Sequence, residues 1–117
     1  MTVQMQLVAR ALSLAPGSLN DSTRCVDFIA STDAVDSYDE IVEQDWILDR
    51  YMANPVVLFG HNSRDLPVGT CLECAVVDRG GRKQLEARIR FLSAEANPMA
   101  EQVFHSIKEG ALRAVSV

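Results

Sequence analysis

The sequence is poor in several residue types, and each shortage excludes a class of protein. Three cysteines, Cys25, Cys71 and Cys74, are too few and uneven in number for the disulfide framework of a small secreted domain. No uninterrupted apolar run is long enough to cross a bilayer. Residues 1–16 lack the basic region, apolar core and cleavage site of a signal peptide. We therefore expect a chain that is neither exported nor inserted in a membrane.

Positive charge is scarce as well. Eleven Lys and Arg face 16 Asp and Glu, which gives a net charge of -5. A surface that binds nucleic acid needs a basic stripe, and this sequence has none, so we expect no nucleic-acid partner. With 48% hydrophobic residues, the 117 residues are enough for one domain with a modest core, which we expect to span residues 1–117.

The pattern of apolar residues predicts a mixed α and β domain. Alternation along the chain predicts strands, weakly within residues 1–15 and more clearly at 24–30, 68–77, 84–92 and 111–117. Apolar residues at helical spacing predict a helix over residues 43–54, with Trp46, Ile47 and Tyr51 on one side, and a second over residues 96–110. The core-facing stripe expected for the second helix is Ala96, Met99, Ala100, Val103, Phe104 and Ile107. The second helix has Asn97 as a plausible N-cap, Pro98 as its first residue and Gly110 past its end. The acid-rich residues 31–40 are predicted to form a solvated loop.

The stretch from Asn54 to Thr70 is the centre of the functional prediction. Pro55 suits the first residue of a strand, residues 56–59 form a short apolar run typical of a buried strand, and Gly60 ends it. His61 follows at once, where a packed strand meets a polar turn. Catalytic groups are often held at such places. A serine hydroxyl is a poor nucleophile unless a base accepts its proton, and histidine is the side chain best suited to do so.

The order of short motifs along the chain resembles the HK97-type phage prohead (capsid maturation) protease family. In sequence order the motifs are Phe28–Ser31, Asp36–Val42, Asn54–Asn62, Pro67–Gly69 and Gly110–Val117. The resemblance covers roughly residues 24 to 117. By this resemblance His61 is the general base and Ser116, which lies 116 − 61 = 55 positions later, is the nucleophile.

The resemblance implies an α+β fold, related to the herpesvirus assemblin proteases, with a mostly antiparallel β-barrel-like sheet and two flanking helices. It implies a serine endopeptidase that processes scaffold or major capsid protein during phage head maturation, in the host cytoplasm inside the assembling procapsid. No cofactor is implied. The family's Gly-Phe after the serine is absent, because the sequence ends at Val117. We therefore expect the N-terminal part of a longer protease, weakly active or inactive, with an exposed sheet edge and a homo-oligomeric state.

Several alternatives stay open beside this reading. Candidates for a third catalytic residue are Asp65, Asp45, Glu43 and His105, although a turn role is expected for Asp65 and a packing or surface role for His105. Cys71 and Cys74 with His61 and Cys25 offer four metal ligands, but positions 71 and 74 of a regular strand point to opposite faces. The two cysteines are more simply small core residues than ligands or nucleophiles. The alternative function is a non-catalytic capsid-assembly or scaffold-associated module with a protease-like fold.

Overall fold

The computed structural model describes residues 5–8, 19–33, 41, 43–60, 64–112 and 114–116. Within them the chain forms six strands and two helices. In chain order these are β1 (Met5–Val8), β2 (Cys25–Thr32), α1 (Asp49–Ala53), β3 (Val56–Phe59), β4 (Gly69–Arg79), β5 (Arg82–Phe91), α2 (Pro98–Lys108) and β6 (Ala114–Ser116). The expected α+β class is confirmed.

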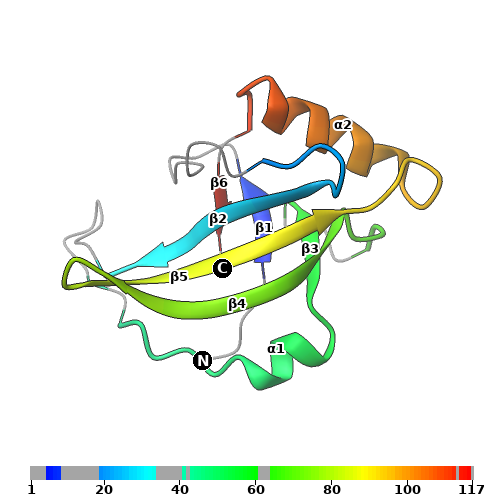
Figure 1. Cartoon of the computed structure of the whole chain (residues 1–117). Coiled ribbons are helices and arrows are strands. Elements are labelled where there is room, and N and C mark those ends of the chain that lie inside the picture. Colours follow the sequence, from blue (N-terminus) through cyan, green and yellow to red (C-terminus); the bar gives the residue numbers. More distant parts are fainter. Residues whose placement is uncertain are drawn as a thin grey trace.

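The strands form one curled sheet in the order β2-β5-β4-β3-β1-β6 (Figure 1). Only β1 and β3 run parallel, and the other four neighbouring pairs are antiparallel. β2 and β6 are the two ends of this order, yet they contact each other. The sheet therefore curls far enough to bring its end strands together, as the prediction of a mostly antiparallel, barrel-like sheet required.

β4 and β5 form a long hairpin, the clearest prediction from the sequence. Gly80 and Gly81 make a two-residue turn, and both have positive φ angles, 63° and 86°, which glycine adopts without strain. Every second residue of β5 from Leu85 to Phe91 is buried, as the alternation predicted. A β-bulge interrupts β4, because Cys71 faces Ile89 while Glu73 already faces Arg88. One residue, Leu72, is therefore extra on this side of the ladder.

Helix α2 begins and ends as predicted. The Asn97 side chain accepts a hydrogen bond of 3.1 Å from the Met99 N–H, and Pro98 is the first helical residue. At the other end Gly110 has a φ of 83°, its N–H donates to the Ile107 carbonyl, and the Ala111 N–H donates to the Ser106 carbonyl. These two bonds form a Schellman motif. The buried stripe is Ala100, Val103, Phe104 and Ile107; Ala96 and Met99, predicted to belong to it, are exposed.

The first predicted helix is much shorter than expected. Only residues 49–53 are helical, and residues 43–48 have no regular structure. Gln44 explains part of the difference, because its side chain donates to the Ser31 hydroxyl and accepts from the Trp46 indole N–H. Ile47, placed on the buried face by the helical pattern, is 64% exposed. Residues 43–48 therefore extend toward the end of β2 without forming a helix.

The core fills the inside of the curled sheet and continues under both helices. One cluster of buried residues joins Val26 and Phe28 of β2 to Leu85 of β5, Tyr51 of α1 and Phe104 of α2. Figure 1 shows α2 across one end of the sheet and α1 at the opposite end, so each helix closes one end of the curl. Neither helix is long and apolar enough to span a membrane.

Candidate functional site

β3 carries the chain to the predicted catalytic histidine. Val57 and Leu58 are buried, and Gly60 ends the strand with a φ of 63°, a conformation that favours glycine. The strand prediction for residues 56–59 is therefore confirmed. His61 itself lies outside the described residues, so the structure places the strand that leads to it and not its imidazole.

Ser116 is the last residue of β6, which is the end strand of the sheet order. Its backbone pairs with Gln6 of β1, and on its other side Gln6 pairs with Leu58 of β3. Ser116, Gln6 and Leu58 therefore lie on one row across three strands. Since neighbouring strands are about 4.8 Å apart, the Ser116 and Leu58 backbones lie roughly 10 Å apart along this row.

The strand of the serine and the strand that leads to the histidine are thus in the same sheet but are not neighbours. β1 stands between them and pairs with both. β3 also runs parallel to β1 and antiparallel to β6, so the chain leaves β3 at the end of the sheet where β6 begins. A contact between the two side chains requires the segment after Gly60 to turn back across β1.

The other candidates for a third catalytic residue lie apart from this row or on the surface. Asp65, in the loop between β3 and β4, is exposed, and so are Glu43 and Asp45, which precede α1. His105 is on the outer side of α2, where its Nε2 lies 2.8 Å from a carboxylate oxygen of Glu101. His105 therefore lies on the surface, which agrees with the expected packing or surface role.

The cysteines of β4 differ from the expectation in one respect. The bulge at Leu72 shifts the alternation, so Cys71 and Cys74 lie on the same, inner face of the sheet, and the argument that they point to opposite faces is wrong. Cys71 is buried and Cys74 packs partly against the core. Contact with the Cys71 sulfur, together with burial, raises the pKa of the Cys74 thiol, which keeps Cys74 protonated. Their prediction as small core residues is confirmed.

Tyr51 completes this buried group from α1. Its hydroxyl donates a hydrogen bond of 3.0 Å to the Val56 carbonyl, and burial, with the neighbouring cysteine sulfurs, raises the pKa of the phenol. Tyr51 and Cys74 therefore stay protonated, whereas the hydrogen bond with Cys74 lowers the pKa of the buried Cys71 thiol. Among the described residues no set of three or more Cys, His, Asp or Glu side chains is arranged to hold a metal ion.

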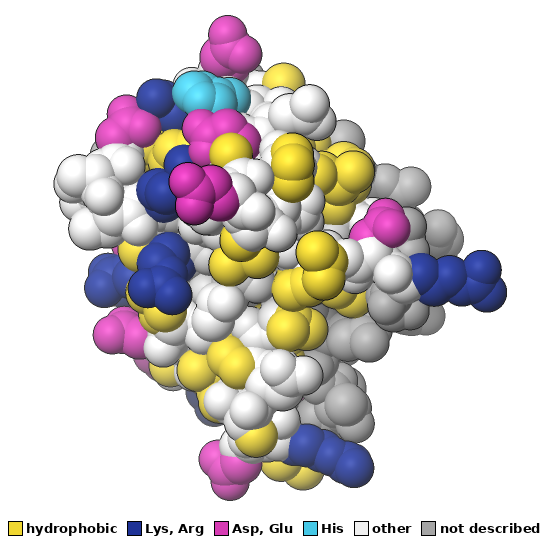
Figure 2. Space-filling model, turned by 90° about the vertical axis from the view of Figure 1, so that its right-hand side faces the viewer, with side chains coloured by type: hydrophobic (Ala, Val, Ile, Leu, Met, Phe, Trp, Pro, Cys, Tyr) yellow, Lys and Arg dark blue, Asp and Glu magenta, His cyan; other side chains and the backbone are white. Residues whose placement is uncertain are grey.

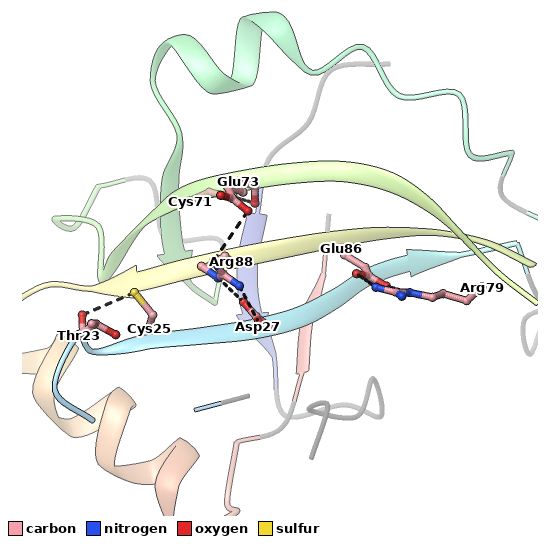
Figure 3. Close-up of polar contacts among 8 residues, drawn as sticks. All are labelled: Thr23, Cys25, Asp27, Cys71, Glu73, Arg79, Glu86 and Arg88. Carbon is pink, nitrogen blue, oxygen red and sulfur yellow. Dashed lines mark hydrogen bonds and ion pairs between the residues drawn. The ribbon is translucent and has the colours of Figure 1, made fainter. Parts of the chain in front are cut away.

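An open groove of about 470 Å³ lies on the outer face of β2, β5 and β4. Ion pairs line it, as Figure 3 shows: the Arg88 guanidinium lies between Asp27 and Glu73, at 2.8 Å and 3.9 Å, and Arg79 contacts both carboxylate oxygens of Glu86 at 3.0 Å. Because its charges are paired within the chain, this groove offers no activated nucleophile or base. It is separate from the row that contains Ser116.

Comparison of the chain with protein families, with curated proteins and with solved structures gives no significant match. The arrangement of β3, β1 and β6 is therefore the feature of the described chain that bears most directly on the predicted site. The position of β1 between β3 and β6 was not predicted, because a weak alternation within residues 1–15 identifies a strand but not its neighbours. The parallel pairing of β1 with β3 has no local signal in the sequence.

Proposed function

We propose that this chain is a serine endopeptidase domain of the assemblin-like, prohead-protease type, with Ser116 as nucleophile and His61 as general base. Its substrate is a scaffold or major capsid protein of an assembling phage head, and it works inside the procapsid in the host cytoplasm. The row shared by Ser116, Gln6 and Leu58 is the observation that carries the proposal. It ties the nucleophile strand and the histidine strand to the same β1.

The chemistry needs only the two side chains and a site for the oxyanion. Ser116 Oγ attacks the scissile carbonyl while His61 takes the hydroxyl proton, and the tetrahedral intermediate collapses as His61 returns that proton to the leaving amine. Water, deprotonated by the same imidazole, then releases the acyl group. Backbone N–H groups near Ser116 would stabilise the oxyanion, as in other acyl-transfer enzymes.

The sheet sets one requirement for this mechanism. Two strand spacings separate the Ser116 backbone from that of Leu58, more than a serine and a histidine bridge when both stay in their own strands. The chain must therefore turn across β1 after Phe59. The positive φ of Gly60 allows such a change of direction directly before His61.

A serine-directed fluorophosphonate tests the proposal without knowledge of the natural substrate. We expect a covalent adduct on Ser116, located by peptide mass spectrometry, and a labelling rate that falls by several orders of magnitude in His61→Ala. His105→Ala is the matched control, because His105 is the second of only two histidines and lies exposed on α2. Ser93→Ala, which removes an exposed serine elsewhere in the chain, controls for adventitious labelling.

The second candidate function is a capsid-assembly or scaffold-associated module that keeps the fold without turnover. The strand between β3 and β6 is the observation that favours it. A folded chain that acquires no adduct on Ser116, or that is slowed equally by His105→Ala and His61→Ala, would overturn the protease and leave this module as the function.

A further inference from the structure

The outer edge of β4 is unpaired over most of its length. β4 has 11 residues and pairs with β5 along almost all of them, but β3 pairs with it only at Gly69 and Thr70. Beyond this point, from Glu73 to Arg79, no described strand lies on the side away from β5. This seven-residue segment is called the β4 edge below.

The hydrogen-bond pattern identifies which backbone groups of the β4 edge are free to pair. In β5 the Lys83 carbonyl accepts from the Asp33 N–H and the Phe91 N–H donates to the Arg24 carbonyl. The backbone N–H and C=O groups of odd-numbered β5 residues therefore point toward β2. Even-numbered residues of β5 therefore face β4. The β4 residues opposite them, Glu73, Ala75 and Val77, point their backbone groups toward β5. The backbone groups of the alternate residues, Cys74, Val76 and Asp78, point away from β5. No backbone hydrogen bond joins these three to another described segment on that side.

The side chains of the β4 edge do not protect it from another strand. Edge strands are commonly shielded by lysine, proline or an inward-pointing charge, and the segment Glu73–Arg79 has no lysine and no proline. Its one charge on the core-bearing face, Asp78, lies beside the hairpin turn, where its carboxylate accepts a hydrogen bond from the Gly81 N–H. Val76 at its centre is 38% exposed, although it lies on the face that carries the core. The seven residues of the β4 edge thus present an unpaired backbone next to an accessible apolar side chain.

The charges at the two ends of the β4 edge match when it pairs with a copy of itself. In a twofold antiparallel arrangement centred on Val76, Glu73 faces Arg79 of the other copy, since 76 − 73 = 79 − 76 = 3. The Glu73 side chain is 74% exposed and its carboxylate lies 3.9 Å from Arg88, whereas the Arg79 side chain is 63% exposed and also pairs with Glu86. Glu73 and Arg79 each point their backbone groups toward β5 of their own chain and away from the other copy. They therefore form a non-hydrogen-bonded pair between the copies, in which Cα atoms are about 4.5 Å apart and the side chains contact each other.

The same register pairs all the outward backbone groups. Val76 faces Val76 of the second copy and Cys74 faces Asp78, so these three pairs exchange about six hydrogen bonds between the chains. We infer that the β4 edge is a homodimer interface, in which two copies join their sheets through antiparallel β4 strands centred on Val76. This inference does not depend on the proposed protease activity.

Apolar side chains gather elsewhere too, on the face that Figure 2 shows. Large hydrophobic residues exposed in the described chain are Ile41, Ile47, Phe59, Leu66, Leu72, Val76 and Met99. Among these only Leu72 and Val76 belong to β4, and Val76 is the one within the β4 edge. If the inferred dimer forms, substitution of Val76 should weaken it, whereas association through another apolar patch should depend on residues outside the β4 edge.

Sedimentation velocity of the full chain and of two matched variants tests the interface. We expect the wild-type chain to sediment as a dimer, Val76→Lys to sediment as a monomer, and Met99→Lys to remain a dimer. Met99, on α2, is 40% exposed, close to the value for Val76, so the two substitutions add the same charge at equally accessible sites. A monomeric wild-type chain, or a dimer that Met99→Lys disrupts and Val76→Lys does not, would overturn the inference.

A charge-exchange series tests the register itself and guards against misfolded variants. Glu73→Arg places Arg opposite Arg79, and Arg79→Glu places Glu opposite Glu73, so each single change should raise the dimer dissociation constant roughly tenfold or more. The double variant E73R/R79E restores opposite charges and should recover the wild-type constant. Circular dichroism confirms folding in each case. Failure of the double variant to recover dimerisation would refute the register centred on Val76.

Discussion

Arg24 and Glu101 form an ion pair of 2.7 Å that fastens the turn before β2 to helix α2. Arg24 has a positive φ of 59°, and its side chain also donates to the carbonyls of Phe91 and Leu92 and lies 4.9 Å from the centre of the Phe104 ring. One guanidinium thus joins β2, the end of β5 and α2. Such a planar set of donors is specific to arginine.

Replacement of Arg24 should therefore loosen α2 from the sheet. We expect Arg24→Ala to lower the free energy of unfolding by about 2–3 kcal/mol, because it removes the ion pair and leaves two carbonyls without their donor. The stability of Arg24→Lys should lie between that of the wild type and that of Arg24→Ala, because lysine keeps the charge but lacks the planar set of donors. Urea denaturation measures both changes. A lysine variant as stable as the wild type would show that donor geometry contributes nothing.

Gly69 is needed because the backbone of β5 lies close to it. A Cβ atom at this position would lie 2.9 Å from the Arg90 carbonyl oxygen, which belongs to the backbone and cannot rotate away. We expect Gly69→Ala to destabilise the fold by about 1–3 kcal/mol through this overlap. Thermal unfolding provides the measurement, and a Gly69→Ala protein as stable as the wild type would contradict the close approach.

The buried phenol of Tyr51 should stay protonated at high pH. Burial raises its pKa, so the native chain should show no Tyr51 ionisation in the range near pH 10 where an exposed tyrosine titrates. The phenolate absorbance step in this range should therefore have the same amplitude in the wild type and in Tyr51→Phe. A smaller step in the variant would show that Tyr51 ionises in the folded protein.

Glu86 should give the fold a contribution to stability that acid removes. Its hydrogen bonds with Arg79 lower the pKa of the carboxyl, so the folded state favours the charged form. This contribution is complete above the unfolded-state pKa of about 4.3 and is lost as the pH falls through the lower folded value. Glu86→Gln should therefore be less stable than the wild type at neutral pH, and the difference should shrink in acid. A difference that persists unchanged below that range would contradict the assignment.

The local elements were predictable where the sequence carries a clear period and recognisable ends. Alternation fixes β5, two glycines fix its turn, and Asn97, Pro98 and Gly110 mark the ends of α2. The helical spacing of residues 43–54 gave a wrong prediction for most of that range. There the hydrogen bond from the Gln44 side chain to Ser31 holds the segment against β2, and a tertiary contact outweighs a local pattern.

The arrangement around the candidate site was less predictable because it depends on contacts between distant segments. The sequence of Met5–Val8 does not predict that this strand lies between β3 and β6. Likewise, the extra residue Leu72 turns Cys71 and Cys74 to one face, and a bulge leaves no mark in an alternation pattern. Candidate residues could be named from the sequence, whereas their spacing across strands could not.

The distance between His61 Nε2 and Ser116 Oγ in an experimental structure tests the proposed protease most directly. The account predicts that the chain after Gly60 crosses β1 and brings the two atoms within about 3.2 Å, or within reach of one bridging water. A histidine that instead stays in line with β3, with its imidazole near the two-strand separation of roughly 10 Å from Ser116, would contradict the catalytic pair. It would make the non-catalytic module the better description of this chain.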